Sequence, residues 1–486
     1  MNSYFYSMQE ELLLDVKNLS THFRTDNGIV KAVDGISFQI YRGETVGIVG
    51  ESGSGKSVTS LSIMRLIPWP PGKIVEGEIT YHETGKLPVD LTKIPDKNMR
   101  HYRGNKISMI FQEPMTSLNP VFTCGNQVDE AIILHQKKSK KEAALLTLDL
   151  FNKVQLPNPE RIYAAYPHEL SGGQKQRVMI AMAMSCNPDI LIADEPTTAL
   201  DVTVQKTILE LMAEIKNKIN SSIIFITHDL GVIAEIADRV LVMYKGKIVE
   251  QGSVLQIFEN PQHPYTRSLL ACRPPLGKRL RKLPVTSDFM SEDASGNIIE
   301  REVSIKSIID DFVVPETETK ERLQALQKLE PLLKIRNVKT YFPIKRTMFG
   351  KVTNYVKAVD DISLDVYPGE TLGLVGESGC GKTTLGRTII RLVEPDSGEI
   401  SFRGKNILEL SHKEMKPLRK DMQIIFQDPY SSLNPRMTIG KAILEPMQVH
   451  HLYANDTERK EKVIELLQKV NMQPDFYNRY PHEFSG

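Results

Sequence analysis

Short apolar runs, each followed by a polar or glycine-rich segment, mark the first half of the chain. Val46–Val49, Ile190–Ala193 and Ser222–Thr227 have the length of buried strands. Helical patterns follow in Val58–Ile67, which we expect to end at Pro68, and in Lys175–Met184. Apolar strands that alternate with helices predict an α/β fold.

The chain also repeats itself, which predicts two similar domains. Four blocks occur twice in the same order: Lys31–Ser37 (KAVDGIS) and Lys357–Ser363 (KAVDDIS), Gly43–Ser57 (GETVGIVGESGSGKS) and Gly369–Thr383 (GETLGLVGESGCGKT), Ile110–Pro120 (IFQEPMTSLNP) and Ile425–Pro435 (IFQDPYSSLNP), Tyr166–Gly172 (YPHELSG) and Tyr480–Gly486 (YPHEFSG). The first copy carries an insertion, and we expect its segments Pro68–Lys73 and Thr84–Lys97 to be surface loops. Because the sequence ends at Gly486, we expect the second copy to be truncated.

Two glycine-rich motifs fit the pattern G-x-x-x-x-G-K-[ST] in matched register. The first comprises Gly50, Glu51, Ser52, Gly53, Ser54, Gly55, Lys56 and Ser57, and the second Gly376, Glu377, Ser378, Gly379, Cys380, Gly381, Lys382 and Thr383. Glycines let the backbone curl until its N–H groups point at phosphate oxygens, and a helix N-terminus adds partial positive charge. We expect each lysine to reach the β- and γ-phosphates and Ser57 or Thr383 to place a hydroxyl on Mg²⁺. The alternative, a glycine-rich turn without a ligand, is disfavoured by the repetition.

Polar residues follow the apolar runs. Asp194 and Glu195 come after the run ILIA, and ligands bind at the carboxyl ends of parallel strands. Asp194 is suited to hold Mg²⁺, and Glu195 to orient or deprotonate an attacking water. His228 follows SIIFIT, and we expect it beside the γ-phosphate. The alternatives are acids that cap a helix and a structural histidine.

A second candidate anion-binding surface lies in LSGGQ. Ser171, Gly172, Gly173 and Gln174 present a hydroxyl and N–H groups at a predicted helix start. The spacing alone does not assign this surface to a particular nucleotide.

Composition narrows the class of protein. The 486 residues are 41% hydrophobic and 25% charged, as is typical of globular chains. Lys and Arg total 61 and Asp and Glu 60, so a general attraction to nucleic acid is not indicated. No apolar run reaches the roughly 18 residues of a membrane-spanning helix. None of the four cysteines forms a CxxC pair, and the basic segment Arg273–Lys282 is interpreted as a solvated face.

The order of these motifs resembles that of ATP-binding cassette (ABC) ATPases. The resemblance rests on the phosphate loop, FQEP, LSGGQ, LIADEP, Asp201 in TALD and His228 in ITHD. GESGSGKS, FQEPMTSLNP, YPHELSGGQ and HPYTRSLL at His263–Leu270 are similar to the oligopeptide/dipeptide importers, which include fused two-cassette forms for glutathione or microcin.

The resemblance implies a P-loop NTPase core, a mostly parallel sheet flanked by helices, with antiparallel β and helical subdomains, tandemly repeated. It implies a complete first cassette over 12–260, an oligopeptide-type extension and linker over 261–330, and a second cassette over 331–486, truncated at its signature motif.

The resemblance also implies roles for single residues. Phe23 and Phe342 would stack on adenine, although each is alternatively a core aromatic and Tyr341 is a rival of Phe342. Gln112 and Gln427 would contact Mg²⁺. The catalytic set would be Lys56, Gln112, Glu195 and His228. ATP would lie between the phosphate loop of one cassette and the LSGGQ segment of another. Ser485 and Gly486 belong to the second copy of this segment. Only Cys272 lies where some relatives hold an iron–sulfur cluster, so no cluster is expected.

The implied function is the ATP-hydrolysing subunit of an importer for peptides or peptide-like solutes. Its partners would be two transmembrane permease subunits and, indirectly, an extracytoplasmic solute-binding protein, with no nucleic acid. It would lie peripherally on the cytoplasmic face of the plasma (inner) membrane. Two chains could pair their first cassettes as a homodimer, whereas we expect weak or no ATP hydrolysis within one chain. The alternatives are an exporter ATPase and a soluble tandem cassette that acts on ribosomes or nucleic acid, although the linker is mixed in charge.

Overall fold

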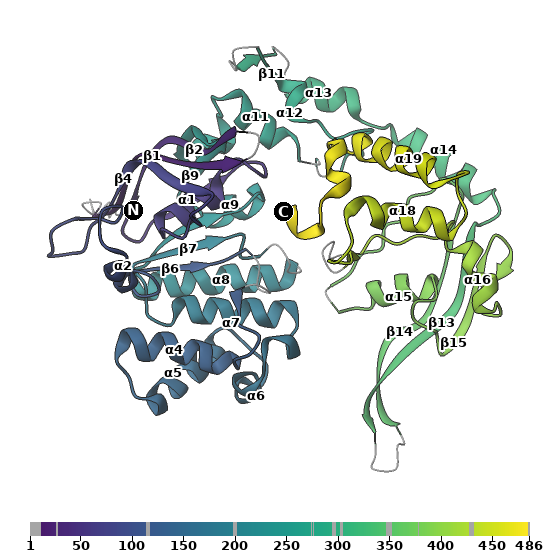
Figure 1. Ribbon diagram of the computed structural model, residues 1–486, viewed down its shortest axis with the longest axis horizontal. Helices are drawn as coiled ribbons and strands as arrows, with labels where there is room; N and C mark the ends of the chain where they lie inside the picture. The colour runs from purple at the N-terminus through teal and green to yellow at the C-terminus, as the bar shows by residue number, and fades with distance from the viewer. Residues whose placement is uncertain are drawn as a thin grey trace, which may run out of the picture. The chain divides into compact units, whose positions relative to one another are not determined.

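The chain contains two compact units, Met1–Glu316 and Thr317–Gly486 (Figure 1). This computed structural model describes residues 11–25, 28–112, 117–197, 202–273, 275, 277–293, 298–301, 305–346, 352–377, 379–426 and 432–484. The predicted division of the chain at residues 260 and 330 stays a prediction.

A six-stranded sheet forms the centre of the first unit. Its order is β10-β9-β3-β8-β7-β6, formed by β3 (Thr45–Val49), β6 (Ile107–Ile110), β7 (Ile190–Asp194), β8 (Ser222–Ile226), β9 (Arg239–Tyr244) and β10 (Lys247–Ser253). All neighbours are parallel except β10, which pairs antiparallel with β9. Every residue of β3, β7 and β8 is buried, as expected for strands covered on both faces. The three strands predicted from apolar runs are therefore confirmed.

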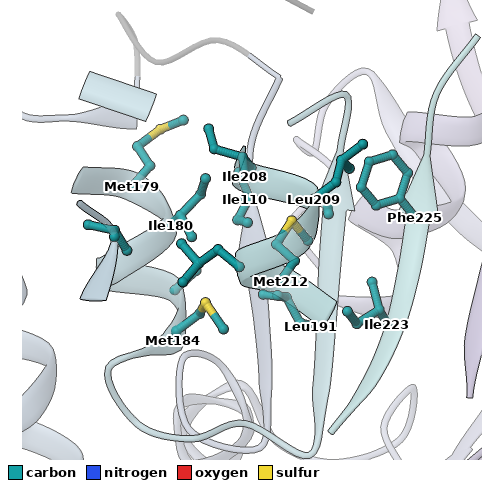
Figure 2. Packing of buried hydrophobic residues seen from close by; sticks show 14 of the residues in the cluster. Ile110, Met179, Ile180, Met184, Leu191, Ile208, Leu209, Met212, Ile223 and Phe225 are labelled. Carbon is teal, nitrogen blue, oxygen red and sulfur yellow. The ribbon is translucent and has the colours of Figure 1, made fainter. Parts of the chain in front are cut away.

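Helices cover one face of this sheet. In Figure 2, Met179, Ile180 and Met184 of α7 (Gly172–Met184) face Ile208, Leu209 and Met212 of α8 (Val202–Ile219), with Leu191, Ile223 and Phe225 of the sheet beside them. A helical group packs against α7, formed by α4 (Cys124–Gln136), α5 (Lys140–Lys153) and α6 (Pro159–Ala164), and η1 (Pro167–Glu169) precedes α7. Thr123 and Ser139 cap α4 and α5 through their side chains.

An antiparallel sheet and helix α1 (Lys56–Ile63) cover the other face. The sheet order is β2-β1-β4-β5, with β1 (Leu12–Thr25), β2 (Gly28–Tyr41), β4 (Gly72–Tyr81) and β5 (Val89–Asp90). A single apolar cluster joins it to the inner sides of β3, β7, β8 and β9.

Two details of the sequence-based prediction were wrong in this region. Helix α1 ends at Ile63 rather than at Ile67, because Arg65 adopts a positive φ of 51° and the N–H groups of Arg65 and Leu66 bond back to the carbonyls of Ser62 and Leu61 at 3.0 and 2.8 Å. The expected surface loops contain regular structure, since β4 begins at Gly72, β5 lies within Thr84–Lys97 and α2 (Asp96–Tyr102) begins there.

The residues after β10 form an extension that packs on the first unit. It comprises α10 (Val254–Glu259), α11 (Pro264–Ala271), α12 (Thr286–Phe289), β11 (Met290–Glu292), β12 (Ile298–Glu300) and α13 (Ile305–Phe312). Ile257 and Tyr265 belong to the same apolar cluster as α7 and α8. In the basic segment, Lys278 pairs with Asp310 at 3.0 Å.

The second unit repeats the antiparallel sheet of the first. Its order is β14-β13-β15-β16, formed by β13 (Leu333–Arg346), β14 (Val352–Val366), β15 (Ser397–Phe402) and β16 (Lys405–Asn406). Its helices are α15 (Lys382–Ile389), α16 (His412–Leu418), α18 (Ile439–Val449), α19 (Asp456–Lys469), η2 (Pro474–Asn478) and η3 (Pro481–Glu483). Helix α14 (Glu316–Gln327) precedes them across the boundary between the units.

The described part of the second unit contains no counterpart of the parallel sheet. Residues 371–377 align with β3 and the start of the phosphate loop but lie outside strands, and Val375 is 90% exposed. In the first unit, β3 is held between β8 and β9. The described residues of the second unit contain no strands that take these places.

The packing of α8 predicts that two leucine-to-alanine substitutions, one buried and one exposed, differ in their effect on stability. Leu209 on α8 is 3% exposed, whereas Leu145 on α5 is 63% exposed. We expect Leu209→Ala to destabilise the first unit by about 2–5 kcal/mol through lost burial and a cavity. Leu145→Ala should change its stability by less than about 0.5 kcal/mol. Denaturant unfolding followed by circular dichroism measures both, and equal effects would contradict the packing.

Candidate functional site

The first phosphate loop connects β3 to α1, as the motif predicts. Gly50 and Gly55 have positive φ angles of 153° and 103°. A Cβ atom at Gly50 would lie 2.2 Å from the Met243 carbonyl oxygen, and one at Gly55 would lie 2.3 Å from that of Ala32. Only glycine fits at these two positions, because backbone atoms of β9 and β2 close around the loop.

Lys56 folds back over the loop from the first turn of α1. Its ammonium donates hydrogen bonds to the carbonyl oxygens of Gly50 and Glu51 at 2.7 and 2.8 Å. Burial lowers the pKa of Lys56, while the negative charges of Glu195 and Asp194 oppose this shift. The lysine is therefore held at the loop within reach of two carboxylates.

Ser57 and Asp194 form a hydrogen-bonded pair of oxygen-bearing side chains. The Ser57 hydroxyl donates to Asp194 Oδ1 at 3.1 Å, and the Asp194 side chain is buried. Burial raises the pKa of Asp194 to about 6, which the Ser57 hydrogen bond opposes. A hydroxyl and a desolvated carboxylate at the edge of a phosphate loop fit Mg²⁺, which takes one or two protein ligands along with phosphate and water oxygens.

Glu195 lies between two other polar side chains. The Gln112 amide donates to its Oε2 at 3.2 Å, and His228 Nδ1 lies 3.2 Å from its Oε1. Glu195 adopts φ of 47°, and its N–H donates to the Ile226 carbonyl at 2.9 Å, which fixes the backbone there. The structure thus brings three residues that were predicted separately into one hydrogen-bonded line.

The topology of the sheet explains this line. Gln112 follows β6, Glu195 follows β7 and His228 follows β8, and these strands are parallel neighbours in the order β8-β7-β6. Their carboxyl ends therefore meet at one edge, beside the phosphate loop after β3.

The LSGGQ segment forms the start of α7, as predicted. The Ser171 hydroxyl accepts from the Gln174 N–H at 3.4 Å, and the Gln174 side chain accepts from the Ser171 N–H at 3.0 Å. This reciprocal cap leaves Ser171 and Gly172 exposed to solvent, and a Cβ atom at Gly172 would meet no atom within 4 Å. Ser171 and Gln174 thus bond to each other and not to the phosphate loop.

The candidate adenine-stacking aromatics lie in the antiparallel sheets. Phe23 on β1 stands opposite Gly72, where a Cβ atom would lie 2.6 Å from the Phe23 ring. Phe342 on β13 is 42% exposed. The Tyr341 hydroxyl donates to Asp360, and Lys357 lies over the Tyr341 ring at 5.4 Å. The proposed stacking of Phe23 and Phe342 stays a prediction.

The second phosphate loop repeats the lysine contacts of the first. Lys382 donates to the carbonyl oxygens of Gly376 and Glu377, both at 2.6 Å, and lies 3.5 Å from Cys380 Sγ. Thr383 follows it in the first turn of α15. The predicted site residues Ser378, Gln427, Ser485 and Gly486, and Asp201 in the first cassette, lie outside the described residues.

One contact of the first loop was not foreseen from the sequence. The hydroxyl of Tyr265, on α11 of the extension, accepts a hydrogen bond from the Glu51 N–H at 2.9 Å. Tyr265 belongs to the segment HPYT, which served only as a sign of resemblance.

Comparisons with known proteins match both phosphate loops. The family model described as ABC transporter matches residues 33–198 and 359–486, and the model described as oligopeptide/dipeptide transporter, C-terminal region, matches residues 249–291. Among the described residues, no helix has both the length and the apolar character needed to cross a membrane.

Curated relatives match almost the whole chain. A protein named glutathione import ATP-binding protein GsiA from Salmonella choleraesuis is 48% identical over 475 residues, which are 98% of this chain and 73% of the relative. Its namesake from Pectobacterium atrosepticum is 46% identical, over 99% of this chain and 74% of that protein. A solved dimeric ATP-binding cassette bound to ADP and phosphate is 28% identical over 50% of this chain and 99% of its own, with a TM-score of 0.45.

Cys380 offers a test of the second loop, because it is exposed and stands where the first loop has Ser54. In a Lys56→Ala chain, we expect N-ethylmaleimide to abolish binding of a fluorescent ATP analogue by placing a bulky group inside the loop. The same chain with Cys380→Ser should keep its binding, since Cys124 and Cys186 are buried and the half-buried Cys272 lies outside the second loop. Unchanged binding after complete modification of Cys380, verified by mass spectrometry, would contradict the prediction.

Proposed function

The chain belongs to the family of ABC transporter ATP-binding proteins, and from this we propose that it binds and hydrolyses ATP to drive a membrane importer of peptides or peptide-like solutes. The observation that carries the proposal is the meeting of Lys56, Ser57, Asp194 and the line of Gln112, Glu195 and His228 at one edge of the sheet. The match of the extension to the oligopeptide/dipeptide region, and relatives named for glutathione import, support the class of solute.

The phosphate loop would hold the polyphosphate. Lys56 would exchange the carbonyl oxygens of Gly50 and Glu51 for β- and γ-phosphate oxygens, because a charged acceptor makes a stronger hydrogen bond than a neutral one. The loop N–H groups and the start of α1 would add further donors. Phe23 would stack on the adenine, and Phe342 would do so in the second cassette.

Ser57, Asp194 and Gln112 would hold Mg²⁺ in the first cassette, and Thr383 and Gln427 in the second. The ion would supply positive charge that offsets the negative charge of the phosphate oxygens. Its position next to Asp194 would also relieve the cost of burying that carboxylate, which is visible in its raised pKa.

Glu195 would orient the attacking water and accept its proton. Both carboxylate oxygens are engaged, one by Gln112 and one by His228, so the plane of the carboxylate is fixed before water arrives. A fixed base loses little freedom on reaching the transition state, which is how positioning lowers a barrier. His228, with 61% of its side chain exposed, would be free on its outer side to contact the γ-phosphate.

The exposed start of α7 would close the site. Ser171, Gly172, Gly173 and Gln174 would offer N–H groups and a hydroxyl to the γ-phosphate bound at another cassette. ATP would then join two cassettes, and loss of the γ-phosphate would let them part. At the cytoplasmic face of the membrane, this cycle would move two permease subunits, to which an extracytoplasmic protein delivers the solute from the opposite side.

Two substitutions separate binding from hydrolysis. Lys56→Ala removes a charged donor, and we expect the affinity for MgATP at the first site to fall roughly 10- to 100-fold in calorimetry. Glu195→Gln keeps the shape of the side chain but not the base, so affinity should persist while hydrolysis by the permease-bound protein falls by about 10²–10⁴. Undiminished affinity of the Lys56→Ala protein would sink the proposed nucleotide site.

The transport role predicts membrane partners. A tagged chain, expressed with the permease subunits encoded beside it, should co-purify with them from detergent-solubilised membranes. Cells with the intact system should take up labelled glutathione or dipeptide, and cells with Glu195→Gln should not. Recovery of the chain with ribosomes and without permeases would favour a different function.

A further inference from the structure

The extension reaches the phosphate loop directly. Tyr265 lies near the start of α11 and is 0% exposed. Its hydroxyl accepts the hydrogen bond of the Glu51 N–H at 2.9 Å, and its ring packs against Tyr244 at the end of β9, with 4.4 Å between the ring centres. A buried tyrosine held between a strand and a loop has little freedom to move away from that loop.

The Tyr265 contact acts on the same peptide group that Lys56 uses. The Glu51 N–H and the Gly50 carbonyl belong to one planar peptide unit, and that carbonyl accepts the Lys56 ammonium at 2.7 Å. Fixing the N–H end of a planar unit fixes the direction of its carbonyl. Tyr265 therefore lies one peptide group away from the lysine proposed to bind phosphate.

Two further contacts join the extension to the site. The hydroxyl of Thr286, the first residue of α12, donates to Glu51 Oε1 at 2.7 Å. The Arg273 guanidinium, just beyond α11, lies 3.8 Å from Asp229 Oδ1. Asp229 follows His228 and caps α9 (Leu230–Ile236) by accepting from the Gly231 N–H at 2.7 Å. Helices α11 and α12 pack against each other, so the contacts of Tyr265, Arg273 and Thr286 all come from the same packed part of the extension (Figure 1).

We propose that the extension is a positioning element of the first nucleotide site and that Tyr265 is its positioning residue, which holds the Gly50–Glu51 peptide in the orientation that accepts a nucleoside di- or triphosphate. The inference rests on the proposed function, because it concerns the same site. In this proposal Tyr265 acts through the loop backbone, by its hydrogen bond with the Glu51 N–H, and not as a ligand of the nucleotide.

Coupling of this kind works in both directions. If an ordered extension favours nucleotide binding, the nucleotide must stabilise the extension by the same factor. A partner that displaces α11 would then weaken nucleotide binding, and the bound nucleotide would resist that displacement. A partner that binds the extension could thereby sense whether the first cassette holds a nucleotide, or change its affinity for the nucleotide.

The test uses the full chain with Lys382→Ala, so that calorimetry with MgADP reports the first site alone. Tyr265→Phe keeps the ring but removes the acceptor of the Glu51 N–H, and we expect the Kd to rise on the order of tenfold. Thr286→Val removes the second contact, which is more exposed, and should raise the Kd about threefold. The control is Tyr163→Phe, which removes a tyrosine hydroxyl bonded to Asp129 in the helical group and should leave the Kd unchanged.

A second measurement separates positioning from general packing. Amide hydrogen exchange of α11 should slow when MgADP binds the parent chain, and this protection should be lost in Tyr265→Phe. A purely structural tyrosine would lower the unfolding temperature without changing either the Kd or the protection. If Tyr265→Phe and Thr286→Val bind MgADP as tightly as the parent does, the inference about Tyr265 fails, while the proposed function still stands. If the parent does not bind MgADP, the proposed function fails with it.

Discussion

Parallel pairing of four strands is the constraint on which the first site depends. The register places Ile110 beside Ala193, Asp194 beside Ile226, and Ile226 beside Ile48. The residues that follow these strand ends are far apart in sequence, yet the hydrogen-bonded ladder delivers them to one edge. No local structure could do this, because Gln112, Glu195 and His228 meet only through the order of the strands.

The second unit shows which part of the site is local. Lys382 makes the same two carbonyl contacts as Lys56, with distances that differ by 0.2 Å or less. These contacts form although residues 371–377 belong to no strand and much of their apolar surface is exposed. The curled loop is therefore a property of its glycines and the following helix, whereas the carboxylates require the assembled sheet.

The same division explains what the sequence could predict. Continuous apolar runs identified β3, β7 and β8, and the motif spacing located the phosphate loop and the Ser171 helix start, because each signal lies within a few residues. The end of α1 was missed because the chain turns at Arg65, which has a φ of 51° although it is neither glycine nor asparagine, and because Arg103, which binds the Met64 carbonyl past this turn, lies 39 residues away. The contact of Tyr265 with Glu51 spans 214 residues and leaves no local pattern. Interactions of this length decide where an element stops and what holds a loop, and a single sequence carries no direct sign of them.

The charges of the site explain why a nucleotide would enter it together with a cation. Lys56 is buried beside two acids, Asp194 and Glu195, which oppose the lowering of its pKa by burial. The same acids would repel a polyphosphate that arrived alone. The desolvated Asp194 carboxylate would gain most from a divalent ion, since burial raises its pKa although the Ser57 hydrogen bond and the Lys56 charge oppose that shift. An ion held by Asp194 would offset the charge of both anions at once, so ion and nucleotide would each increase the affinity of the site for the other.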